Sequence, residues 1–233
     1  MAQTHMIKRG REVSRIEGFS DAVFGFALTL LVASIEVPPD FGALKQTLRG
    51  FLPFALTFAL ISWIWYLHYS FFRQFGLEDR LTIVLNSILL FVVLFFVYPL
   101  KVMANALVGI GQATFSSLGE YDNRFLMVAY SSGVIAVFLV FFLLNWNAYR
   151  QRKALDLKPS DLYDIGTALR AHASSTLLGV ASVILAMALP MKFFGLAGLV
   201  YALEGPLQGA IGWTRGIRRA RVFRAAALDA PTS

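Results

Sequence analysis

Long apolar runs separated by short polar segments dominate the pattern of hydrophobic and polar positions along this chain. A membrane-spanning helix needs about 20 largely apolar residues, because the hydrocarbon core of a bilayer is about 30 Å thick. Several runs reach that length. They predict an all-α polytopic membrane protein with six transmembrane helices, at residues 16–37, 51–72, 81–104, 125–149, 172–190 and 193–213. No segment between them is long enough to fold as a soluble domain, so residues 1–233 are expected to form a single six-helix transmembrane domain.

The composition supports this prediction and excludes several classes of protein. Hydrophobic residues make up 57% of the chain and charged residues 15%, whereas soluble domains carry about 25% charge. The chain has no cysteine, which excludes disulfides, thiolate zinc sites and cysteine-ligated clusters. His5, His68 and His172 lack the paired spacing of a metal site, and no glycine-rich nucleotide loop is present. We therefore predict no enzyme activity, no cofactor and no resident metal.

The positive charge predicts how the chain is oriented in the membrane. The net charge is +7, and sixteen of the 21 Lys and Arg residues lie in the two tails, the second-to-third connection and the fourth-to-fifth connection. By the positive-inside rule both termini are expected to be cytoplasmic, which requires an even number of spans. The last span is followed by five arginines, which fit this topology better than a nucleic-acid site and would also suit anionic lipid, namely Arg215, Arg218, Arg219, Arg221 and Arg224.

Polar residues in three of the predicted spans lie at one depth. Ser20, Asp21, His68 and Asn86 are each about five residues inside the predicted cytoplasmic boundary, which corresponds to roughly 7 Å of helix. A buried Asp21 needs a partner, and Arg15, His68 and Asn86 are the candidates. We interpret the group chiefly as a polar clasp that ties three helices together, with direct proton or metal chemistry as the alternative.

A second intramembrane acid, Glu204, lies beside Gly205 and Pro206 in the predicted sixth span. Acids inside a membrane often take part in ion transport. A Gly-Pro kink, with the carboxylate bonded to freed backbone groups or to neighbouring side chains, explains the same pattern equally well. Both interpretations stay open at this stage.

The first span opens with R-x-x-x-F-S-D, formed by Arg15, Phe19, Ser20 and Asp21. This motif resembles the prokaryotic branch of the transmembrane protein 175 family, the lysosomal potassium channel family. The order of the later residues is also similar to that family, namely Trp65, His68, Phe71 or Phe72, Glu78, Asp79, Asn86 and Pro99. The specific motifs are confined to the first 100 residues.

The resemblance implies a potassium-permeable cation channel, built as a homotetramer in a bacterial plasma membrane, with the first helices lining a central pore. It implies a hydrophobic constriction on that helix as gate and filter. The narrowest family position, an aliphatic residue, corresponds to Phe26 here, and Thr29 corresponds to a position that influences preference among cations. Potassium is then the permeating ion and not a cofactor.

Helical spacing places Phe26, Thr29, Leu30 and Ala33 on one face, as a pore lining requires. Alternatively, Phe26 and Leu30 face lipid or neighbouring helices and Thr29 bonds back to its own helix. Two other functions remain as alternatives to a channel. One is a proton-coupled secondary transporter that uses Glu204 or Asp21, and the other is an assembly protein without ion flux.

Overall fold

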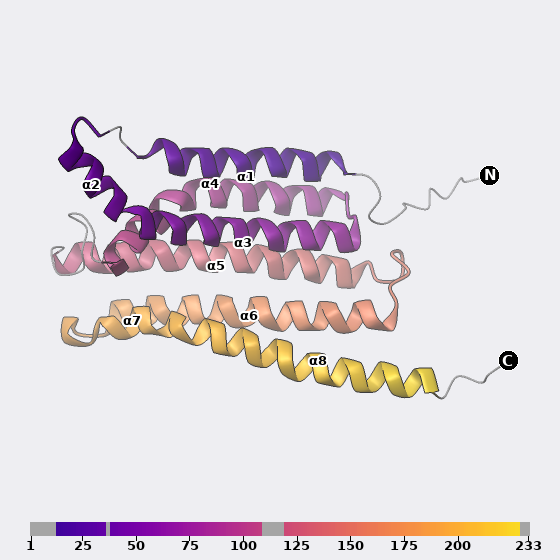
Figure 1. The fold of residues 1–233 in the computed structure, drawn as a ribbon. Coiled ribbons are helices and arrows are strands. Elements are labelled where there is room, and N and C mark those ends of the chain that lie inside the picture. The colour runs from indigo at the N-terminus through magenta and orange to yellow at the C-terminus, as the bar shows by residue number, and fades with distance from the viewer. Residues whose placement is uncertain (1–12, 36–37, 109–118, 229–233) are drawn as a thin grey trace.

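The protein is a bundle of long helices (Figure 1). The structure, a computed structural model, describes residues 13–35, 38–108 and 119–228. Within these ranges the chain forms α-helices joined by short connections and two 3-10 turns. In chain order they are α1 (Arg15–Ala33), α2 (Phe41–Arg49), α3 (Phe51–Phe75), α4 (Arg80–Val108), α5 (Glu120–Arg150), α6 (Pro159–Ala188), η1 (Met191–Phe193), α7 (Gly195–Leu199), η2 (Val200–Leu203) and α8 (Glu204–Leu228).

The first five predicted spans each correspond to a helix that is long and apolar enough to cross a membrane, namely α1, α3, α4, α5 and α6. The helix that corresponds to the fifth span is longer than the predicted span. α6 begins at Pro159, thirteen residues before the expected start at residue 172. Hydropathy missed this portion because it carries Asp161, Asp164 and Arg170. The helix is nevertheless favoured there, because Pro159 suits a first turn and Asp161 accepts a hydrogen bond from the Lys158 backbone N–H at 3.0 Å.

The sixth predicted span, 193–213, is interrupted as the sequence indicated, but by the 3-10 segment η2 rather than by a kink at Gly205 and Pro206. The chain returns along the bundle through η1, α7 and η2, and only at Glu204 does it enter α8. Pro206 lies in the first turn of α8, where its missing N–H leaves no helical bond unmade. α8 is not among the described helices that are apolar enough to span a membrane. It continues to Leu228, so most of the predicted basic carboxyl-terminal tail is helical.

The helices are ordered from one edge of the bundle to the other. α1 packs against α3 and α4, α4 packs against α5, α5 against α6, and α6 against α8. Figure 1 shows α1 and α8 along opposite edges, and α1 begins at the same end of the bundle at which α8 ends. The amphipathic helix α2 projects at the other end (Figure 1).

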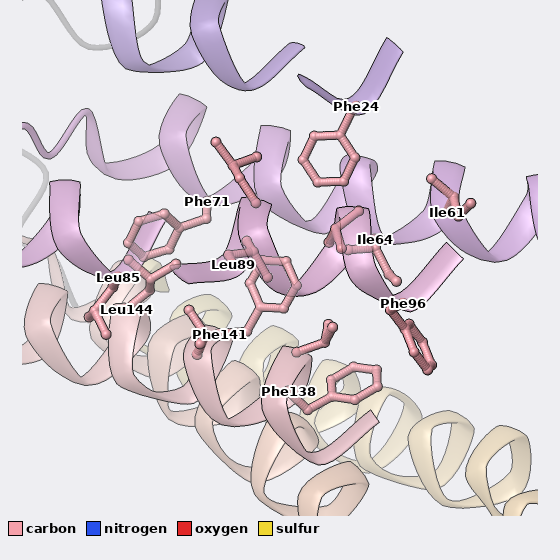
Figure 2. Close-up of a cluster of buried hydrophobic side chains, with 14 of the residues drawn as sticks. Phe24, Ile61, Ile64, Phe71, Leu85, Leu89, Phe96, Phe138, Phe141 and Leu144 are labelled. Atoms are coloured by element: carbon pink, nitrogen blue, oxygen red, sulfur yellow. The ribbon is translucent and has the colours of Figure 1, made fainter. Parts of the chain in front are cut away.

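Apolar side chains of α1, α3, α4 and α5 meet in a common core (Figure 2). Phe24 of α1 is 2% exposed, and Leu89 of α4 and Leu144 of α5 are fully buried. α4 and α5 approach closely where Gly133 faces the ring of Phe96, with no space for even a methyl group. This contact sets how closely α4 and α5 pack against each other.

Candidate functional site

The two faces of α1 differ sharply in burial. Ser20, Phe24, Ala27 and Leu31 are 0–2% exposed and face the core, where α1 packs on α3 and α4. The opposite face is uncovered in the single chain, and its exposed side chains are Phe19, Ala22, Phe26, Thr29 and Ala33. Leu30, predicted on the same stripe, is half-buried at its edge. α1 therefore presents a continuous, largely apolar stripe that can face a partner subunit, lipid or a pore.

Phe26 and Thr29 lie one turn apart on this exposed stripe. The Phe26 side chain is 56% exposed. The Thr29 hydroxyl donates to the Gly25 carbonyl at 2.9 Å, which is the bond that the alternative to pore lining predicted. A hydroxyl that has used its only proton still keeps acceptor capacity. Thr29 can therefore offer oxygen, but not a proton, to whatever lies outside the stripe.

The start of α1 is fixed by a capping box. The Glu17 backbone N–H donates to the Ser14 hydroxyl at 3.2 Å, and the Glu17 carboxylate accepts from the Ser14 backbone N–H at 2.9 Å. Ser14 and Glu17 were not among the predicted residues, although serine followed three residues later by glutamate is a known helix-start pattern. The box sets where the stripe begins.

Three of the residues predicted at one depth do come together. The Asn86 side-chain amide donates to the Ser20 hydroxyl at 2.9 Å, and its carbonyl lies 2.9 Å from His68 Nε2. With the amide oriented this way, His68 carries its proton on Nε2. All three side chains are at most 3% exposed. They link α1, α4 and α3 through a single chain of hydrogen bonds, as the clasp interpretation requires.

Asp21 is not part of that chain. Its Oδ1 accepts a hydrogen bond from the Trp65 indole at 2.8 Å, so the predicted partners Arg15, His68 and Asn86 do not bond to it. Residue 21 lies 100° further round the helix than residue 20, which carries the carboxylate out of the buried face toward α3. Arg15 is exposed and, within the described ranges, makes no ion pair. Trp65 was visible in the sequence only as part of the family-like spacing.

The other end of α1 is fastened by a residue that the sequence analysis counted only as a charge. The Lys101 ammonium of α4 donates to the Ser34 carbonyl at 2.9 Å and to its hydroxyl at 2.6 Å. Ser34 is the C-cap of α1, and a cation is favourable at the carboxyl end of a helix. Both ends of the exposed stripe are therefore tied to the helices behind it.

Glu204 is the first residue of α8, the helix that lies along the opposite edge of the bundle from α1 (Figure 1). Its Oε1 accepts from the Ser175 hydroxyl at 2.5 Å and from the Gln208 amide at 2.9 Å. The expectation that neighbouring side chains hold the carboxylate is confirmed. The structure does not bring Glu204 together with Asp21.

Comparisons with known proteins identify relatives along almost the whole chain. The family described as "Endosomal/lysosomal potassium channel TMEM175" matches residues 15–96. A potassium channel of Marivirga tractuosa is 41% identical over 217 residues, which are 88% of each protein. A potassium channel of Streptomyces collinus is 28% identical over 151 residues, covering 62% of this chain and 68% of the relative.

Solved structures give the same result for the fold. The crystal structure of a variant of the potassium channel MtTMEM175, in complex with a nanobody fusion protein, superposes with a TM-score of 0.79 at 37% identity, over 89% of this chain and 95% of that one. A TMEM175 homologue from Chamaesiphon minutus has a TM-score of 0.58 at 23% identity, over 86% and 96%. This second likeness shows a shared fold.

Proposed function

The chain belongs to the TMEM175 family of potassium channels, and from that premise we propose that it forms a potassium-permeable cation channel whose pore is lined by the exposed stripe of α1. One observation carries the proposal. Phe26, Thr29 and Ala33 are exposed on a helix whose opposite face is buried against α3 and α4. A homotetramer with α1 at its centre would turn these stripes toward one another and leave α6 and α8 on the outside.

The gate in this proposal is a dry constriction at Phe26. A ring of apolar side chains that narrows a pore expels water, and an ion cannot cross because nothing replaces its hydration. When the ring widens, water returns and ions pass. Just beyond the ring, Thr29 oxygens would face a partly dehydrated cation. Potassium passes more readily than sodium because it gives up its hydration at lower cost.

The two ends of α1 set the tilt of the pore helix in this mechanism. The Ser20–Asn86–His68 chain holds one half of α1 to α3 and α4, and Lys101 holds the other end. No redox or organic cofactor takes part, and potassium is the permeating ion. The protein would lie in a bacterial plasma membrane with both termini in the cytoplasm and its basic segments near anionic lipid.

The direct test is potassium efflux from proteoliposomes of the purified protein, with a protonophore to carry counter-current and sodium-loaded vesicles in parallel. A channel gives flux that needs the protonophore and is larger for potassium. In contrast, a proton-coupled transporter accumulates potassium when only a pH gradient is imposed. Light scattering on the detergent-solubilised protein should give a tetramer, and a monomer that conducts would contradict the shared pore.

Phe26→Ala is the decisive variant, because it removes the ring from the proposed constriction. We expect severalfold higher flux or weaker preference for potassium over sodium. Phe125→Ala is the matched control, since Phe125 is also exposed but lies on α5. Unchanged flux and selectivity in folded Phe26→Ala protein would remove Phe26 from the gate.

A further inference from the structure

A second site lies away from α1, in a cavity between α3, α4, α5 and the start of α8. Its volume is about 180 Å³. Five aromatic side chains and one carboxylate contribute to its wall, namely Trp63, Phe96, Tyr130, Phe138, Tyr201 and Glu204. Figure 2 shows two of them, Phe96 of α4 and Phe138 of α5, approaching from neighbouring helices. The remaining wall is aliphatic.

The ring contacts in this cavity fall into two groups. Trp63 and Phe138 have ring centroids 5.7 Å apart, Phe96 and Tyr130 are also 5.7 Å apart, and Tyr130 meets Tyr201 edge-on at 5.2 Å. Aromatic faces carry partial negative charge, and a cation within about 6 Å of a ring centroid is attracted to it. Trp63, 38% exposed, reaches from the cavity wall to the surface of the bundle.

The carboxylate in this wall is partly buried and lies near mid-length of the bundle. Ser175, which donates to Glu204 Oε1, is near the middle of the 30-residue helix α6. Both hydrogen-bond donors to Glu204, Ser175 and Gln208, are neutral. Within residues 13–35, 38–108 and 119–228, no cationic side chain forms an ion pair with it. A carboxylate at this depth without a counter-charge is costly, and a bound cation would supply that charge.

We propose that this cavity binds a small organic cation of the ammonium class, with its alkyl groups against the rings and its charge toward Glu204. The volume is below the roughly 300–1,000 Å³ of pockets for drug-sized ligands, which restricts the ligand to a few heavy atoms. Alkylated ammonium ions suit an aromatic cage better than potassium does, because they are weakly hydrated and their methyl groups pack on ring faces. The site belongs to each subunit and is separate from the α1 stripe.

The test measures binding of tetramethylammonium to the purified full-length protein by isothermal titration calorimetry, with tert-butanol as a neutral molecule of similar shape. We expect saturable binding of the cation only. Glu204→Gln and Trp63→Leu should each weaken it about tenfold or more, the effect of losing one desolvated cation interaction. Glu78→Gln and Trp146→Leu are matched controls with exposed side chains outside the cavity, and they should bind like the wild type.

Two further variants keep the result decisive. Leu60→Trp, at a partly exposed position of the wall, should block the cavity and abolish binding while keeping Glu204, so the test holds even if Glu204→Gln does not fold. Phe26→Ala should bind normally, because it changes only the α1 stripe. The proposal would be overturned if tert-butanol bound as well as tetramethylammonium. It would also be overturned if Leu60→Trp still bound tetramethylammonium normally, or if Phe26→Ala lost that binding.

Discussion

Two groups of polar side chains, one buried and one partly buried, lie near opposite edges of the bundle and differ in how their hydrogen bonds are arranged. Beside α1, Asn86 is the only link between Ser20 and His68. Beside α8, the Gln208 amide lies within hydrogen-bonding distance of three acceptors, which are Ala171 O, Ser175 Oγ and Glu204 Oε1. The first group is a single neutral chain, whereas the second is redundant and carries a charge.

This difference separates a structural role from a binding role. A neutral chain with one link holds helices in one arrangement, because breaking the link leaves buried groups unpaired. A redundant group tolerates the loss of one bond and keeps a charge available for a ligand. This difference agrees with helix positioning by the α1 group and with the proposed ligand binding beside the α8 group.

The largest expected effect comes from Asn86→Ala, which removes the link of the α1 group. The substitution leaves Ser20 Oγ and His68 Nε2 unpaired, and we expect it to lower the free energy of unfolding by about 2–4 kcal/mol. Thermal unfolding in detergent, followed by size-exclusion chromatography, measures the change. Asn145→Ala is the control, since the Asn145 amide bonds only within its own helix, to Phe141 O at 2.9 Å. Equal melting temperatures for the two variants would show that the chain holds nothing together.

Gly133→Ala tests the close packing of α5 against α4. An added Cβ would lie 2.1 Å from the Phe96 ring, and overpacking of this kind costs about 1–3 kcal/mol. The same thermal assay applies. Gly212→Ala in α8 meets nothing within 4 Å, so it should be neutral or slightly stabilising through helix propensity. A harmless Gly133→Ala would mean that α4 and α5 can separate without loss.

Asp79, between α3 and α4, offers a pH-dependent link to α5. Partial burial alone would raise the pKa of its carboxyl, but hydrogen bonds from Thr82, Gln151 and Asn147 outweigh this and hold the pKa below the ordinary 3.8. A carboxyl with a lowered pKa in the folded state stabilises the protein while ionised, and this contribution disappears as the pH falls through the lowered pKa.

Asp79→Asn should therefore cost about 1 kcal/mol at neutral pH, because the amide keeps one acceptor oxygen where the carboxylate has two, and Thr82, Asn147 and Gln151 lose a charged hydrogen-bond partner. The melting-temperature difference from the wild type should shrink as the pH is lowered below 3.8. The measurement is a pair of pH series from neutral to acidic buffer. A difference that stays constant over the series would contradict the role of the ionised carboxylate.

The smallest effect is expected for Ser175→Ala in the α8 group. Glu204 keeps its bond from Gln208 at 2.9 Å, so we expect a loss of about 1 kcal/mol or less. Ser174→Ala, whose hydroxyl bonds only to the Ala171 carbonyl of its own helix, provides the baseline. If Ser175→Ala destabilised the protein as much as Asn86→Ala, the contrast between the two groups would be lost.

Some features of the site were predictable because they depend on local sequence. The common depth of Ser20, His68 and Asn86 follows from counting along three apolar runs, and these side chains meet as expected. The hydrogen bond from the Trp65 indole to the Asp21 carboxylate was not predictable. It depends on how α1 and α3 are rotated about their axes, and hydropathy does not contain that information.

The sequence by itself determined that the chain crosses a membrane repeatedly, where five of the crossing helices lie and which face of α1 carries Phe26 and Thr29. These properties arise from residue polarity and helical period, which act over one or two turns. Only the fold shows that the 3-10 segment Val200–Leu203 interrupts the last helical stretch, that Lys101 caps α1, and that five aromatic side chains line a cavity together with Glu204. Those features require contacts between residues distant in the chain, and such contacts depend on how whole helices pack.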